Sequence, residues 1–246
     1  MSRSRLWLVS CLVALVVFAT PLLVAGALTK AAPEIRFIQT GKNMSALFVT
    51  HQERVLIINS DDRGVTRSAL GRLARPWEPA TTTLLAPADD DAAIGLWEAL
   101  RDPRIQQVIV VGVPGRDPIW SRIERECVQR GVEIEYITAT SHVELTDATL
   151  TIEPTGMTIG VHSRGSVVAI ALTNQPPSLA ANVAVVNDLT TLPPAADLVL
   201  APSFPNEVLE APVVKVNDRE TVRLVFQHMT VRVQGGSVSA GEPRAN

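Results

Sequence analysis

The chain has 246 residues, of which 46% are hydrophobic and 19% charged, and its formal net charge is -3. This apolar content is enough for the core of one globular domain and excludes general disorder. There is no basic surplus and no dense cluster of Lys and Arg, which argues against a protein that binds nucleic acid through a general positive charge.

The N-terminus predicts a membrane segment. Arg3 and Arg5 precede an apolar stretch, Leu6–Leu28, that contains no charged residue and is long enough to cross ~30 Å of hydrocarbon as a helix. The two arginines predict a cytoplasmic N-terminus and an exported C-terminal domain. We therefore expect a single-pass anchor in the cell membrane. The alternative is a cleaved signal peptide, with small residues at Ala25–Ala27 as the cleavage site, which would release a secreted protein.

The two cysteines, Cys11 and Cys127, do not predict a disulfide, because one lies in the membrane segment and the other in the folded domain. Cys127 falls in a helix-like stretch, and we interpret it as a small buried hydrophobic residue rather than a reactive thiol.

The first half of the chain predicts a connector at Ala31–Pro33 and then strands interrupted by helices. Short β-branched or aromatic runs predict strands at Ile35–Gln39, Ser45–Thr50, Arg54–Asn59, Thr81–Ala86, Gln106–Gly112 and Val132–Thr138. Helical spacing and terminating Pro or Gly residues predict helices at Val65–Arg75, Ala93–Leu100 and Pro118–Arg130.

The second half predicts strands alone. These lie at Ala148–Ile152, Met157–Val161, Ser166–Leu172, Asn182–Val186, Leu198–Ala201, Val213–Val216, Arg223–Phe226 and Met229–Val233. The organisation is therefore an N-terminal segment (1–33), one domain (34–233) and a loose tail (234–246). Many strands with few helices favour an α+β fold of two face-to-face sheets with helices outside, rather than a strictly alternating parallel sheet.

Six sequence blocks of this domain form a recognisable series: in chain order they are Ile38–Leu47, Val55–Asn59, Leu84–Leu96, Ser163–Leu172, Val183–Leu189 and Asp197–Asn206. The third block falls in register on the pattern L-L-T-H-P-D-A-D-H-I-G-G-L. Together the blocks resemble one family, the metallo-β-lactamase-like domain that follows the last membrane span of ComEC-type competence proteins. The resemblance implies a four-layer αββα sandwich with a metal site at one edge.

The resemblance does not carry the family's chemistry with it. Family members hold one or two metal ions through imidazoles and carboxylates, and the metal lowers the pKa of a bound water. The positions that match the family's histidines are Pro87, Ala92, Ser203 and Phe204. None of these side chains is an imidazole, so we expect no catalytic residues, no cofactor and a pseudo-enzyme.

Three carboxylates survive at motif positions, namely Asp89, Asp91 and Asp188, with Asp90 in addition. An oxygen-only ligand set suits Mg²⁺ or Mn²⁺ better than Zn²⁺. The competing interpretation, which we favour, is that the acidic run caps the helix that follows, because acidic side chains bind the free N–H groups of a helix N-terminus. The four histidines, His51, His142, His162 and His228, lie outside the motif positions.

These observations give three hypotheses. The first is a membrane-anchored, non-catalytic binding or assembly module with a protein partner. The second is a divergent phosphodiesterase or nuclease that uses Mg or Mn on the surviving aspartates. The third is an anchored α+β domain without an active site, whose resemblance is chance. A nucleic-acid partner or a role in DNA uptake follows from family analogy alone.

Overall fold

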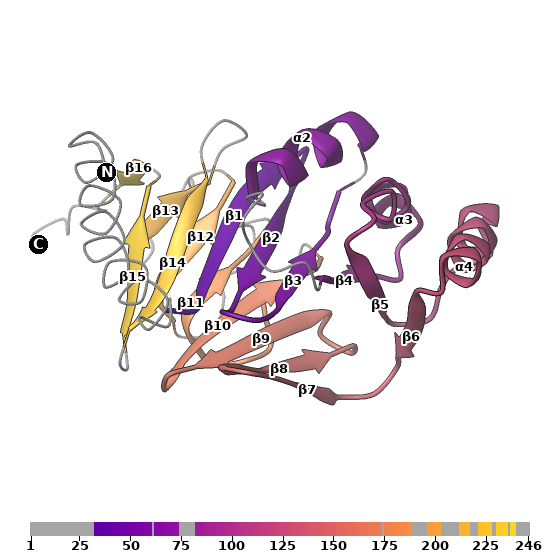
Figure 1. The fold of residues 1–246 in the computed structure, drawn as a ribbon. Helices are drawn as coiled ribbons and strands as arrows, with labels where there is room; N and C mark the ends of the chain where they lie inside the picture. The colour runs from indigo at the N-terminus through magenta and orange to yellow at the C-terminus, as the bar shows by residue number, and fades with distance from the viewer. Residues whose placement is uncertain are drawn as a thin grey trace, which may run out of the picture. The chain divides into compact units, whose positions relative to one another are not determined.

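The computed structural model describes residues 32–60, 62–73, 82–173, 175–187, 196–202, 212–216, 221–227, 230–235 and 237–239. From Ala32 onward these residues form one unit, built of two eight-stranded sheets and three helices (Figure 1). The architecture is therefore mixed α/β with two large sheets and few helices.

The first sheet has the strand order β15-β14-β1-β2-β3-β4-β5-β6. Its members are β1 (Glu34–Thr40), β2 (Asn43–Val49), β3 (Arg54–Ile57), β4 (Thr82–Pro87), β5 (Ile105–Val111), β6 (Glu133–Ile137), β14 (Val222–Gln227) and β15 (Thr230–Gln234). Pairing is antiparallel from β15 to β3 and parallel from β3 to β6.

The second sheet has the order β16-β13-β12-β11-β10-β9-β8-β7. Its members are β7 (Ser141–Leu145), β8 (Ala148–Glu153), β9 (Thr158–Ser163), β10 (Ser166–Ala171), β11 (Ala181–Val185), β12 (Ala196–Ala201), β13 (Val213–Lys215) and β16 (Ser237–Ser239). Pairing is antiparallel from β7 to β10, parallel from β10 to β13, and antiparallel between β13 and β16.

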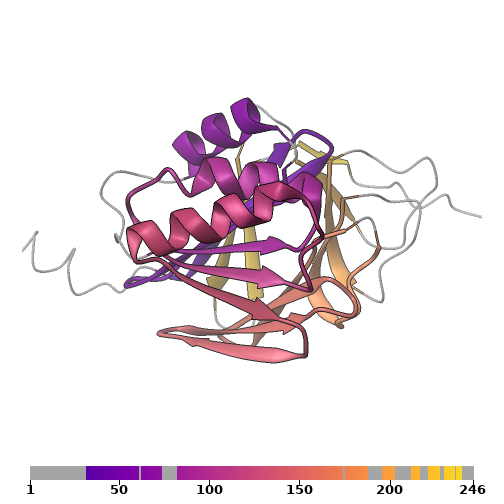
Figure 2. The same cartoon turned by 90° about the vertical axis from the view of Figure 1, so that its right-hand side faces the viewer.

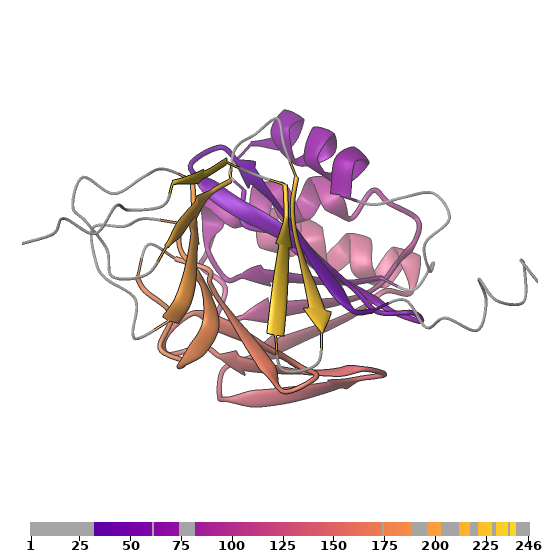
Figure 3. The ribbon, with the colours of Figure 1, turned by 90° about the vertical axis from the view of Figure 1, so that its left-hand side faces the viewer.

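The three helices connect the parallel strands of the first sheet. They are α2 (Arg63–Leu73), α3 (Asp90–Ala99) and α4 (Pro118–Arg130). The bounds of α4 are those expected from the sequence, because Asp117 caps its N-terminus, Pro118 opens it, and Gly131 ends it with φ 67°. Figures 2 and 3 show all three helices on one side of the first sheet and the second sheet on its other side.

Burial on both faces explains why the first sheet reads as nearly continuous apolar runs. Along β1, Ile35 and Phe37 belong to a core shared with residues of the second sheet, such as Leu150 and Ile170. Ile38, on the opposite face, belongs to a separate core beneath the helices. The first sheet is therefore the middle layer of the described unit.

The expected strands and helices within the described residues are confirmed, with boundary shifts of up to three residues. The alternation of strands and helices expected in the first half of the domain is confirmed, because α2, α3 and α4 connect β3 to β6. The short strand β7 was missed, and Ser237–Ser239, inside the stretch expected to be a loose tail, pairs with β13. A helical layer over the outer face of the second sheet, which a four-layer sandwich requires, is not found among the described residues.

A buried ion cluster lies where the domain begins. Glu34 accepts hydrogen bonds from Arg36 and Arg223, and Arg36 also donates to the carbonyl oxygen of Leu73 at 2.6 Å. Burial raises the pKa of Glu34, but the hydrogen bonds from Arg223 and Arg36 outweigh this effect and hold the pKa below its ordinary value. The cluster ties β1 to β14 and to the end of α2.

The predicted anchor, Leu6–Leu28, and Cys11 lie outside the described residues. Among the helices that the structure describes, none has both the length and the apolar character needed to cross a membrane.

Candidate functional site

The motif positions of the third block lie at the end of β4 and the start of α3. Pro87 is the last residue of β4 and pairs with Val111 of β5. Ala92 is buried in α3, with 3% of its surface exposed. Neither side chain has a lone pair to offer a metal ion, so the two positions that the resemblance matches to histidines contribute only packing here.

The acidic run at the N-terminus of α3 has structural partners. The carboxylate of Asp89 accepts the backbone N–H of Asp91 at 3.0 Å, which makes Asp89 the N-cap. Asp90 accepts the indole N–H of Trp120 at 2.8 Å and so joins α3 to α4. The side chain of Asp91 is exposed. The capping interpretation is thus confirmed for Asp89, with the helix beginning three residues earlier than expected.

Two buried amide side chains link the sheets at this edge. The amide nitrogen of Asn59, after β3, donates to the carbonyl of Leu172, after β10, at 2.9 Å. From the second sheet, Asn187 accepts the N–H of Met44 at 3.0 Å and donates to the carbonyls of Ala171 and Thr173 at 3.1 and 3.2 Å. Both amides are therefore occupied by backbone groups.

An apolar contact completes the same edge. Met157 and Gly112 both have positive φ, 44° and 103°. A Cβ atom on Gly112 would lie 3.1 Å from the terminal methyl of Met157 and 3.3 Å from the Cβ of Ala88. Glycine is thus needed here both for its backbone conformation and for space, and the chain packs closely where the resemblance implies a metal site.

The remaining motif residues, Asp188, Ser203 and Phe204, lie outside the described residues, as does His228. Within the described ranges, no group of three or more His, Cys, Asp and Glu residues is arranged to hold a metal ion.

The three described histidines all lie away from this edge. His51, in the turn between β2 and β3, shares a hydrogen bond of 2.6 Å between its Nδ1 and a carboxylate oxygen of Asp147. His142 and His162 lie on β7 and β9 of the second sheet, on either side of β8. Burial, and in addition the nearby His142, lower the pKa of His162 below its ordinary value.

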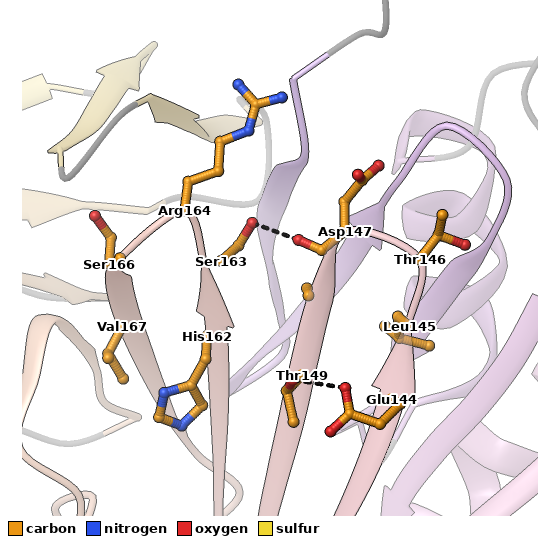
Figure 4. Close-up of a pocket in the computed structure, with 12 residues that line it drawn as sticks. Glu144, Leu145, Thr146, Asp147, Thr149, His162, Ser163, Arg164, Ser166 and Val167 are labelled. Atoms are coloured by element: carbon orange, nitrogen blue, oxygen red, sulfur yellow. Dashed lines mark hydrogen bonds between the residues drawn. The ribbon is translucent and has the colours of Figure 1, made fainter.

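An open groove of about 490 Å³ lies between the tips of two hairpins, β7–β8 and β9–β10 (Figure 4). It lies at the start of β10, whereas Asn59 and Asn187 link the two sheets at the other end of that strand. In Figure 4 the side chains of Arg164 and Asp147 project past the strand ends, while His162 lies lower on β9, with Thr149 and Glu144 beyond it. His162 and Ser166 both line the groove. The Nε2 atom of His162 and the Oγ atom of Ser166 are buried and find no hydrogen-bond partner among the described residues.

Polar contacts beside the groove connect the ends of the two sheets. Besides the His51–Asp147 bond, the N–H of Thr146 donates to Glu53 at 3.0 Å, and the hydroxyl of Thr146 donates to Gln52 at 3.0 Å. Sequence reasoning did not find the groove, because it depends on which turns meet in space. For Asn59 and Asn187 the sequence does contain an indication of their role, since each is a polar residue that directly follows the apolar residues at the end of a strand.

Comparison of the chain with protein-family models and with curated proteins found no match in either case.

Proposed function

We propose that the chain is a degenerate metallo-β-lactamase-like domain of the four-layer αββα type. In this proposal the edge that would bind metal has become a structural seam, meaning a set of contacts that only holds the two sheets together. The domain then acts as a non-catalytic binding or assembly module. The proposal further holds that the N-terminal segment anchors this domain to the membrane and that the domain is exported. A protein is the expected partner.

One observation carries the proposal. At the edge where a metal site of this family would require imidazole ligands, the polar side chains are hydrogen-bonded to backbone groups and the apolar ones are packed together. Asn59 and Asn187 bond to backbone groups across the sheets, Asp89 caps α3, and Met157 packs against Gly112. Water activation by Zn²⁺ depends on a fixed set of N, O or S ligands with one open position. Two sheets packed face to face, with helices over one of them, are also consistent with the family architecture.

The metal hypothesis is tested by measuring metal bound to the full chain, purified in detergent micelles and dialysed against about 10 µM Zn²⁺, Mn²⁺ or Mg²⁺. We expect far less than one ion per chain. We also expect Asp188→Ala and Asp91→Ala to bind the same small amount as the control Glu135→Ala, which removes an exposed carboxylate on β6.

Stoichiometric binding that Asp188→Ala abolishes and Glu135→Ala preserves would refute the proposal. It would support instead a divergent phosphodiesterase or nuclease, which should then cleave single-stranded DNA with Mg²⁺ or Mn²⁺. The membrane part is tested separately with a C-terminal alkaline phosphatase fusion. Activity in the membrane fraction is expected, whereas activity released into the medium would indicate a cleaved signal.

A further inference from the structure

Among the described strands, each sheet has two at its edges, and edge strands in general offer backbone N–H and C=O groups to other chains. In the first sheet the edges are β6 and β15, and in the second they are β7 and β16. Antiparallel pairing of an edge strand with its own copy places the central residue opposite itself. The side chains of each strand therefore determine whether self-pairing is favourable.

The edges of the first sheet oppose self-pairing by charge. The central residue of β6 is Glu135 and that of β15 is Arg232, and both side chains are exposed. Two copies paired about either centre would bring like charges directly opposite each other, which destabilises a strand pair. Charged edge residues of this kind are a common protection against aggregation.

β7 has the opposite character. Its sequence, Ser-His-Val-Glu-Leu, is centred on Val143. Antiparallel pairing about Val143 puts His142 opposite Glu144 of the second copy, and Glu144 opposite His142 of the second copy. Both side chains are exposed on the outer face of the sheet, so in each half of the pair an imidazole faces a carboxylate that can accept a hydrogen bond from it.

The inner face of β7 also favours a partner strand. Val143 and Leu145 are only partly buried, and they pack against the core between the two sheets. The core is therefore open at this margin, which lies at the lower side of the described unit in Figures 1 and 2. A second strand beside β7 would cover these two side chains and extend the core.

The backbone of β7 is suitably oriented. Leu145 and Ala148 flank the two-residue turn between β7 and β8, and residues that flank such a turn form a hydrogen-bonded pair, with the pairs alternating beyond it. His142 and Glu144 consequently direct their backbone groups to the free edge. They are the same two residues that face each other across the self-paired edge.

We propose that β7 is a self-association edge, through which two copies of this chain join their second sheets by antiparallel pairing centred on Val143. A five-residue strand buries little surface, so the dimer belongs to the weak, transient class, with dissociation in the micromolar to millimolar range. The proposal does not depend on the metal-binding state of the other edge.

Disulfide trapping in the full chain tests both the edge and the register. Cys11→Ser provides the background, because Cys127 is fully buried. Residues directly opposite each other in an antiparallel pair have Cα atoms about 4.5–5.5 Å apart, within the range of a disulfide. We expect Val143→Cys to form a covalent dimer under mild oxidation. Ser141→Cys or Leu145→Cys alone should not, but the two combined should, since they face each other across the two-fold axis.

Failure of Val143→Cys to cross-link would overturn the proposal. Equal cross-linking by Glu135→Cys on β6 and Arg232→Cys on β15 would also overturn it, because it would indicate random collision. Cross-linking by Ser141→Cys alone would refute the register.

The His142–Glu144 pairing is tested by sedimentation of the same detergent-solubilised chain over a range of concentrations. Glu144→Lys should weaken association about tenfold, because the imidazole then faces an ammonium group instead of a carboxylate. His142→Glu combined with Glu144→Lys should restore association to within about threefold, since a carboxylate again faces a hydrogen-bond donor. Thr149→Val removes the intrachain bond to Glu144, 2.9 Å long, and should leave association unchanged. A dimer insensitive to Glu144→Lys, or lost in Thr149→Val alone, would contradict the pairing of His142 with Glu144.

Discussion

Replacing Asn187 by Ala tests whether the edge that resembles a metal site is a structural seam. The substitution removes three hydrogen bonds, with the N–H of Met44 and the carbonyls of Ala171 and Thr173. Asn187 is 7% exposed, so water cannot readily replace them. Each buried polar group left without a partner costs about 1–3 kcal/mol.

The two carbonyls keep a second lone pair for other donors, so the expected loss of unfolding free energy is about 2–4 kcal/mol. In a domain of this size, such a loss lowers the Tm by roughly 5–12 °C. The assay is urea and thermal unfolding of the full chain in detergent, followed by tryptophan fluorescence, to which Trp97 and Trp120 of the described unit contribute.

Asn182→Ala is the matched control. Asn182 accepts the N–H of Val167 at 2.9 Å and donates to Asp197 at 3.1 Å, but it is more accessible, so its loss should cost no more than about 1 kcal/mol. If Asn187→Ala left stability unchanged or raised it, the seam interpretation would be refuted. Substitution of a residue that is kept for activity often leaves stability unchanged or raises it, because such residues are maintained at a cost in stability.

Three further predictions concern the described side chains. Because the pKa of His162 is lowered by burial and by His142, its NMR titration midpoint should lie below that of an unperturbed histidine, about 6.5. The unfolded state then binds more protons, so stability should fall as the pH drops through about 6.5, and less so in His162→Gln; a midpoint at or above the unperturbed value would contradict this. Burial raises the pKa of the Cys127 thiol, so in the Cys11→Ser background a thiol reagent should label the chain only after unfolding, and labelling of the native chain would refute its burial. Finally, Asp89→Ala should destabilise by about 0.5–2 kcal/mol through loss of the cap, whereas Asp91→Ala, whose side chain is exposed, should change stability by less than about 0.5 kcal/mol; equal effects would argue against capping.

The amino-acid sequence by itself determined the local structure of this protein. The apolar runs of β4 and β5 specify buried strands, and Asp117, Pro118 and Gly131 fix both ends of α4, because caps and side-chain periodicity act over a few neighbouring residues. That Pro87 and Ala92 offer no ligand atom to a metal ion was likewise evident from residue types alone.

Tertiary structure decided what depends on residues far apart in the chain. It joined Asn187 to Met44, 143 positions away, and His51 to Asp147, and it brought two hairpin tips together to form the groove. It also made β7 an edge strand, which its five residues do not specify. Such pairings depend on how two sheets stack and which turns meet, and local propensity carries no information about either.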